Sequence, residues 1–275
     1  MSIRAEALGV LGEPQPFDAP YRSERAAFLW LLERELRRFL NIWRYSLIGP
    51  ILSTALFVIV FGTVLGAHVD RVYGVPYGQF IVPGLVAQAI VNVGFFNGTT
   101  SLFEARRDRY IHDVFASPLR WWEIDLALVA GGVIRGILTA AGVLAVAIPL
   151  TGVGVERPFV LLVGTAGVLV VAAQVGVIAG SLATSLDHLY SMESIVLLPL
   201  GFLGGVFYPV DQLPAGWALV SHFDPIFWLV QVERIGFLGQ SDVPASAALG
   251  VVWGLALATS LWSARIFATG RRLKP

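Results

Sequence analysis

Residues Phe103 to Glu123, FEARRDRYIHDVFASPLRWWE, form a strongly charged segment between two long apolar runs. The segment carries four arginines and four acidic residues, and Pro118 disfavours a helix through the residue before it. This pattern predicts a short amphipathic helix in a cytoplasmic loop that ends at Ser117. Two interpretations stay open: the arginines only anchor the flanking runs at the membrane surface, or the helix receives a soluble partner.

The whole chain is too apolar for a water-soluble domain. Of its 275 residues, 56% are hydrophobic and 14% are charged, whereas soluble domains contain about 25% charged residues. The chain has no cysteine, which excludes disulfides, thiol catalysis and metal sites with cysteine ligands. We therefore expect a membrane protein.

The chain has a single lysine, Lys274, and Pro275 follows it. A phosphate-binding Walker loop needs a lysine followed by serine or threonine after a glycine-rich turn. This chain cannot contain such a loop, so an ATPase that drives it would be a separate polypeptide. We expect no enzymatic activity and no cofactor in this chain.

The N-terminal part divides into a tail and an amphipathic helix. Residues 1–23 are proline-rich and lack an apolar core, which excludes a secretory signal and predicts a flexible cytoplasmic tail. Residues 24–44 carry arginines between apolar residues spaced three or four apart, which predicts an amphipathic helix. The apolar set is Phe28, Leu32, Leu36, Phe39 and Trp43. Tryptophan and arginine together favour a helix lying on the inner membrane surface, with a soluble surface helix as the alternative.

Six apolar runs follow, and a bilayer core needs about 20 helical residues. The predicted spans are about 47–67, 80–102, 126–150, 159–186, 194–210 and 243–264. The fifth run is short and contains Pro199, Gly204 and Gly205, which favours a broken or partly re-entrant helix. Residues 211–242 are semi-polar and aromatic, which is typical of short helices at the outer interface.

The basic residues predict the orientation. Fifteen lie in segments assigned to the inside, three lie outside at Arg71, Arg157 and Arg234, and Arg135 lies within the third run. This positive-inside bias predicts six crossings with both termini in the cytoplasm. The fold class that follows is an all-α membrane protein with six transmembrane helices, an N-terminal interfacial helix and short re-entrant helices after the fifth span.

Arg135 is the most costly residue in the predicted membrane, at roughly 2.5–3.5 kcal/mol on insertion scales for a helix centre. Two roles stay open for it. It either faces a pathway or gate inside the bundle, or it is held by backbone carbonyls of a broken helix or by Gln88, Asn92 or Gln174.

Glycine pairs four residues apart permit close helix packing, although each pair alone is a weak signal. They are Gly62/Gly66, Gly132/Gly136, Gly176/Gly180, Gly201/Gly205 and Gly250/Gly254.

The four histidines are scattered without a partner at metal-binding spacing, so we expect no metal site. The basic residues follow the inner membrane surface, which indicates anionic lipids rather than nucleic acid as partners.

Several short motifs point to one family. They are YGQFIVPG at 77–84, RYIHDVFASPL at 109–119, GGVIRG at 131–136, GGVFYP at 204–209, and DPI at 224–226 with RIGF at 234–237. In this order they resemble the permease subunits of ABC-2-type exporters, the bacterial family that includes drug, polysaccharide and nodulation-factor exporters. The resemblance covers roughly residues 25–272, so we treat residues 24–275 as one ABC-2 type transmembrane domain.

The resemblance implies a half-transporter that pairs with a second copy of itself. It also implies two copies of a separate ABC ATPase, which bind the ATP and Mg²⁺. In the family, the helix between the second and third spans is a coupling helix that seats in the ATPase, and the first helix also touches it. The corresponding residues are Arg107, Arg109, His112, Asp113, Val114, Phe115, Ser117 and Pro118.

The family's helices after the fifth span close the pathway from outside. The corresponding residues are Pro199, Gly204, Gly205, Phe207, Tyr208 and Pro209. Relatives commonly carry acidic residues and a leucine pair before the proline of the coupling segment. This chain has His112-Asp113-Val114-Phe115 there, which suggests a docking surface suited to a particular ATPase.

The predicted function is therefore that of the membrane subunit of an ABC exporter in the bacterial inner membrane, working by alternating access. An ion-coupled secondary transporter is the alternative. Proton relays use Asp, Glu or His inside spans, and none of the six runs contains one away from its ends. Sodium could still bind carbonyls between Pro199 and Gly205, and a non-transporting scaffold is a third possibility.

Overall fold

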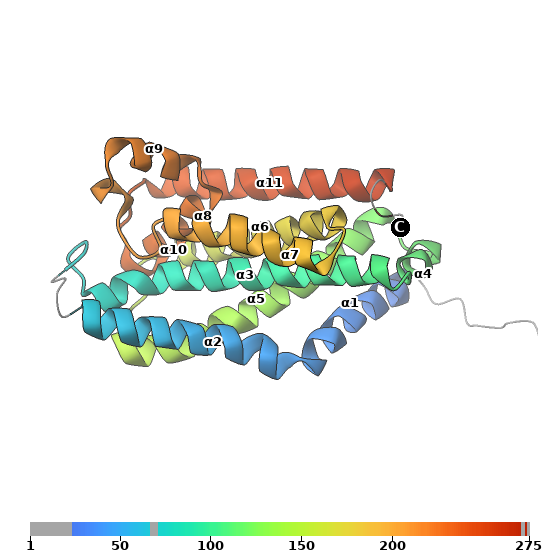
Figure 1. Cartoon of the computed structure of the whole chain (residues 1–275), viewed down its shortest axis with the longest axis horizontal. Coiled ribbons are helices and arrows are strands. Elements are labelled where there is room, and N and C mark those ends of the chain that lie inside the picture. Colours follow the sequence, from blue (N-terminus) through green and yellow to red (C-terminus); the bar gives the residue numbers. More distant parts are fainter. Residues whose placement is uncertain (1–23, 67–70, 271–272, 274–275) are drawn as a thin grey trace, which may run out of the picture.

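The structure, a computed structural model, describes residues 24–66, 71–270 and 273. The predicted tail, residues 1–23, lies outside these ranges. The described chain is a bundle of long helices and contains no strand (Figure 1).

The elements follow one another along the chain with short connections. They are α1 Glu24–Asn41, α2 Trp43–Ile59 with a π-helical extension Val60–Leu65, α3 Tyr77–Arg107, α4 Ile111–Ala116, α5 Trp121–Thr151, α6 Pro158–Leu182, α7 Leu186–Met192, a π-helical segment Glu193–Leu197, α8 Leu198–Leu203, a 3₁₀ turn Val210–Gln212, α9 Ala215–Phe223, α10 Pro225–Leu238 and α11 Ala245–Thr269. We call the end of the bundle that holds α4 and the end of α11 the α4 end, and the opposite end the α9 end (Figure 1).

Four helices, α3, α5, α6 and α11, are long and apolar enough to cross a membrane. They contain most of the second, third, fourth and sixth predicted runs. A fifth span is possible if α1 and α2 count as one broken crossing, because residues 27–41 and 46–62 meet at a bend of 57°. Six spans stay a prediction, because the fifth predicted run is divided between the π-helical segment, α8 and the turn that follows.

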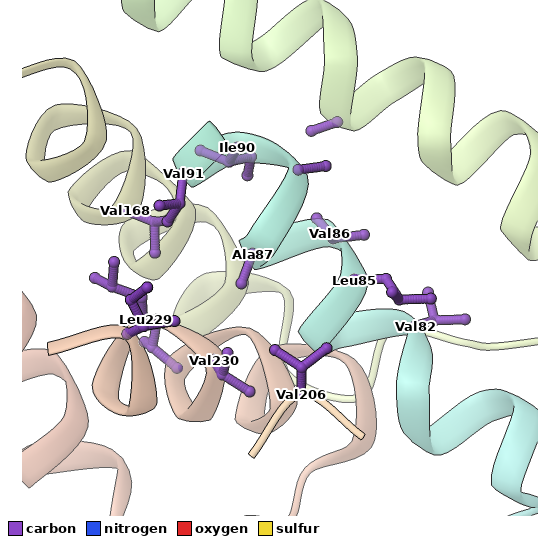
Figure 2. Close-up of a cluster of buried hydrophobic side chains, with 14 of the residues drawn as sticks. Val82, Leu85, Val86, Ala87, Ile90, Val91, Val168, Val206, Leu229 and Val230 are labelled. Atoms are coloured by element: carbon purple, nitrogen blue, oxygen red, sulfur yellow. The ribbon is translucent and has the colours of Figure 1, made fainter. Parts of the chain in front are cut away.

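Helix α3 is the centre of the bundle. It packs against α2, α5, α6 and α10, and Phe80, Ile81 and Ile90 are fully buried. Figure 2 shows Leu229 and Val230 of α10 pointing toward α3, with Val206 beside them. The hydrophobic core therefore joins the long spans to the helices near the α9 end.

The glycine pairs serve different surfaces. A Cβ atom built on Gly176 would lie 2.4 Å from the Phe95 carbonyl oxygen, and one on Gly180 would lie 2.8 Å from the Thr99 carbonyl oxygen. These two glycines of α6 therefore let its backbone approach α3 closely. Nothing lies within 4 Å of a Cβ atom built on Gly250 or Gly254 of α11, so that pair packs against no described residue.

We predict that Gly176→Val destabilises the protein and that Gly250→Val does not. Valine at position 176 would overlap backbone atoms of α3, and overpacking of this kind costs about 1–3 kcal/mol or more. Thermal unfolding of the purified protein in detergent checks this difference. Equal unfolding temperatures for the two variants would contradict the assigned α3–α6 contact.

The region predicted as short interfacial helices divides into an exposed and a buried part. Helix α9 exposes Trp217 and Phe223, as predicted for an interface. Helix α10 packs against α3, α6 and α11, and its residues from Ile226 to Leu238 are buried except for Trp228. The sequence predicted short helices in this region, but it did not indicate that α10 would bury Arg234 inside the bundle.

Candidate functional site

Helix α4 presents a small polar and aromatic surface at the α4 end. The chain reverses after α3 at Arg109, which has a left-handed backbone with φ 61°. Ile111 is buried in an apolar cluster with residues of α1, α3 and α5, so the helix is anchored through its first residue. His112, Asp113 and Phe115 are exposed, Phe115 to 39%. The helix ends where Ser117 takes an extended backbone before Pro118, as predicted.

Helix α1 lies beside α4, and a groove of about 570 Å³ runs between them. Arg34 of α1 lies over the Tyr110 ring at 4.9 Å and joins the two helices. The groove also contains Trp30, Arg37 and Asp113, so it combines an aromatic ring with both signs of charge.

The predicted coupling residues therefore lie in different surroundings. His112, Asp113 and Phe115 share the exposed side of α4. Arg107 instead donates two hydrogen bonds to Asp108, at 2.8 and 3.1 Å, and this contact lowers the pKa of the Asp108 carboxyl. The remaining predicted members are an exposed Arg109, a half-buried Val114, the cap residue Ser117 and the exposed Pro118.

Arg135 finds its partner on α3. Its Nη1 donates to Asn97 Oδ1 at 3.5 Å, and its guanidinium lies 5.8 Å from the Phe39 ring centre. The predicted partners are engaged elsewhere: Gln88 donates to Asn92 at 3.0 Å, and Gln174 donates to Asp125 at 3.4 Å. The expectation that one of these amides holds Arg135 was therefore wrong.

Glu35 is a buried carboxylate that the sequence did not indicate. It accepts hydrogen bonds from Arg34 at 2.9 Å, Arg38 at 3.1 Å and Ser101 at 2.7 Å. Arg38 also donates to Asn97 Oδ1 at 3.2 Å, so one amide oxygen is shared by arginines from α1 and α5. The residues of α1 that are buried are Leu31, Glu35 and Phe39. Only Phe39 belongs to the predicted apolar face, and the other two each precede a predicted residue by one position.

A cavity of about 390 Å³ lies between α2, α3, α5 and residues 193–207. Arg135 and Glu193 line it together with the amides Gln88 and Asn92. The rings of Phe57, Phe202 and Phe207 also line it. Phe207 lies 5.6 Å from Phe57 and 5.5 Å from Phe202 between ring centres, so these rings form one aromatic cluster.

The predicted gate residues after α8 form a compact turn. Gly205 has φ 75°, a conformation that glycine adopts without steric cost. Phe207 accepts a hydrogen bond from the Tyr77 hydroxyl at 2.8 Å, and Tyr208 donates to the Phe202 carbonyl at 2.9 Å. Gly204 and Pro209 are buried in the same turn, whereas Pro199 is exposed on α8, away from it.

A fully buried arginine ties this turn to α10 and to the loop before α3. Arg234 donates to the Gly205 carbonyl at 2.7 Å and lies 4.3 Å from the Phe80 ring centre. Its Nη1 is 3.6 Å from Asp242, which also accepts hydrogen bonds from Tyr73 and Gln231. Sequence reasoning missed this network because its members come from three separate segments, and only the RIGF motif at 234–237 marked the position.

Two further buried carboxylates lie in the bundle. Asp125 of α5 accepts a hydrogen bond from Ser263 of α11 at 2.6 Å and thereby joins these helices near the α4 end. Glu233 of α10 is buried beside Thr165 of α6. Neither lies inside one of the six predicted runs, which explains why the sequence indicated no acidic residue at membrane depth.

Residues 26–238 match the ABC-2 type transporter family. This range contains the α4 surface, the Arg135 cavity and the turn after α8.

Named relatives agree with this match. The chain is 33% identical over 243 residues to the inner membrane transport permease YadH of Escherichia coli (strain K12), which covers 88% of this chain and 94% of that protein. It is 27% identical over 213 residues to nodulation protein J of Rhizobium leguminosarum bv. trifolii, covering 75% of this chain and 79% of that protein. It is also 28% identical over 214 residues to nodulation protein J of Sinorhizobium fredii (strain NBRC 101917 / NGR234), covering 74% of this chain and 79% of that protein.

Proposed function

The chain belongs to the ABC-2 type transporter family and is a membrane permease of an ABC transporter, and we propose that it forms the translocation pathway of an exporter driven by a separate ATPase. The proposed location is the bacterial inner membrane, with both termini and the α4 end in the cytoplasm. The fifteen basic residues assigned to the inside support this orientation.

The observation that carries the proposal is the exposed surface of α4 beside α1. A helix anchored by Ile111 can transmit force to the spans, because α1, α3 and α5 contribute to the same apolar cluster. His112, Asp113 and Phe115 point away from the cluster and are free to seat in a cleft of the ATPase. ATP and Mg²⁺ would bind to that ATPase, because this chain lacks a lysine in a phosphate-binding loop.

The cavity lined by Arg135 is the proposed part of the pathway in this copy. Exposed apolar side chains of α2 and α8 flank it, among them Leu52, Leu56 and Phe202. A second copy of the chain would cover these side chains and enclose the cavity from the other side. We therefore propose a homodimer with two ATPase subunits.

Reconstitution into liposomes tests the proposed function. We expect no cargo movement by the purified chain alone, and ATP-dependent movement that vanadate blocks once the cognate ATPase is added. ATP-independent export by the chain alone would overturn the proposal.

An ion-coupled transporter is the second candidate, favoured by the buried carboxylates Asp125 and Glu233. It predicts transport driven by a proton or sodium gradient without an ATPase. The same liposomes distinguish the two functions when a gradient is imposed in the absence of ATP.

A further inference from the structure

The cavity next to Arg135 changes its chemistry along its length. At the depth where α2 begins, Arg135, Glu193 and Ser46 line it. Toward the N-terminus of α3, Asn92 follows first and Gln88 lies about one turn beyond it. Toward the α9 end, the lining consists of the aromatic cluster of Phe57, Phe202 and Phe207. A ligand that fits this sequence of surfaces has a polar head and an apolar tail.

Among the residues that the structure describes, no carboxylate forms an ion pair with Arg135. Its only described polar partner is the neutral amide of Asn97, at the long distance of 3.5 Å, and its Nε has no hydrogen-bond partner. A second cation, Arg38, donates to the same amide oxygen at 3.2 Å.

This arrangement differs from that of the neighbouring arginines. Glu35 accepts from both Arg34 and Arg38 and balances part of their charge. Arg135 approaches Asn97 and lines the cavity, where a ligand can reach it. Arg135 is half-buried. A partly desolvated cation without a carboxylate is costly, and an anionic ligand would reduce that cost with charge-assisted hydrogen bonds.

We propose that the cavity binds an amphipathic anion, with the anionic group on Arg135 and the apolar chain against Phe57, Phe202 and Phe207. The inference rests on the proposed function and names the class of cargo for the same site. The side-chain amides of Gln88 and Asn92 also line the cavity and offer hydrogen-bonding groups near the head of the ligand.

Glu193 is a carboxylate in the same cavity, and its charge would repel an anionic ligand. It lies on the π-helical segment before α8, lines the same cavity and forms no described ion pair. A zwitterionic ligand would use Glu193 and Arg135 together, whereas an anion uses Arg135 alone. The two ligand classes therefore respond differently to the neutral variant Glu193→Gln.

The absence of cysteine from the chain allows a site-specific binding assay. Ser53→Cys places one thiol in the cavity, and Ser191→Cys places one on the exposed surface of α7 as a matched control. The full-length protein in phosphatidylcholine nanodiscs is labelled with a maleimide in the presence of dodecyl phosphate. Dodecyl glucoside serves as the neutral probe with the same chain.

We expect dodecyl phosphate to slow labelling of Ser53→Cys and to leave Ser191→Cys unchanged. When Arg135→Gln is added to Ser53→Cys, we expect that about tenfold more dodecyl phosphate is needed for the same protection from labelling. This factor is typical of losing one charge-assisted contact. Arg135→Lys keeps the charge and is expected to retain most of the protection. Glu193→Gln is expected to leave it unchanged or to strengthen it.

Three results would overturn the inference. Equal protection by the neutral probe would remove the role of the charge, and equal losses in Arg135→Gln and Glu193→Gln would assign a zwitterion. If labelling of Ser53→Cys is already slow in phosphatidylglycerol nanodiscs without any probe, the ligand of the cavity is a resident lipid instead of cargo. None of these results depends on the ATPase, so they are separate from a failure of ATP-driven transport in liposomes.

Discussion

The double variant Asp113→Ala with Phe115→Ala is expected to lose ATP-driven transport by roughly tenfold or more, because truncating an interface anchor costs about 2 kcal/mol. Both side chains are exposed on α4, so their removal leaves the apolar cluster around Ile111 in place. The protein should therefore insert and unfold normally. The measurements are vanadate-sensitive transport in liposomes and stimulation of the ATPase by the added permease.

A matched control comes from α7, which also has exposed polar and aromatic side chains. Asp187→Ala with Tyr190→Ala also removes one exposed carboxylate and one exposed ring. We expect this pair to retain most of the transport. Unchanged transport and unchanged ATPase stimulation in the α4 variant would refute its coupling role.

The variant Arg234→Ala is expected to lower the free energy of unfolding by about 3–5 kcal/mol, the usual cost of breaking a buried ion pair by removing one partner. Asp242 would stay buried without its cation, and the Gly205 carbonyl would lose its donor. Thermal unfolding in detergent measures the change. The turn after α8 would also lose its tie to α10, so we expect faster proteolysis there.

Arg157→Ala is the control for this prediction, because Arg157 is exposed in the loop before α6. Its effect should stay within about 0.5 kcal/mol, as for most surface substitutions. The double variant Arg234→Leu with Asp242→Asn should recover part of the lost stability, because it removes both charges. If Arg234→Ala unfolds like the unmodified protein, the network around Asp242 contributes nothing to stability.

The sequence located most of the helices. Lipid offers no hydrogen-bond partner to the backbone, so a long uncharged run has to be helical if it crosses a membrane. The runs at 80–102 and 126–150 lie within α3 and α5 for this reason. The charged segment before Pro118 likewise predicted α4, and it lies within residues 26–238, which match the family.

The buried polar networks required the tertiary structure. Glu35, Asn97 and Arg135 come from α1, α3 and α5, far apart in the sequence, and nothing in any one of these segments indicates that the three residues meet. Glu233 and Arg234 lie in a semi-polar segment that predicted short helices at the outer interface, whereas α10 buries both side chains. Local patterns report only which residues share a helix face, and they contain no information on which faces meet.

Composition and hydrophobic periodicity by themselves determined that this chain is a helical membrane protein with a hydrophilic hairpin at Phe103–Glu123. Only the packed bundle decided that Gly176 contacts α3 while Gly250 contacts nothing described, and that Arg135 faces a cavity without a carboxylate partner. The physical reason is that hydrogen bonding and apolar burial act within each segment and fix the helices one by one. The pairing of side chains between helices depends on the packing angles and depths of the whole bundle.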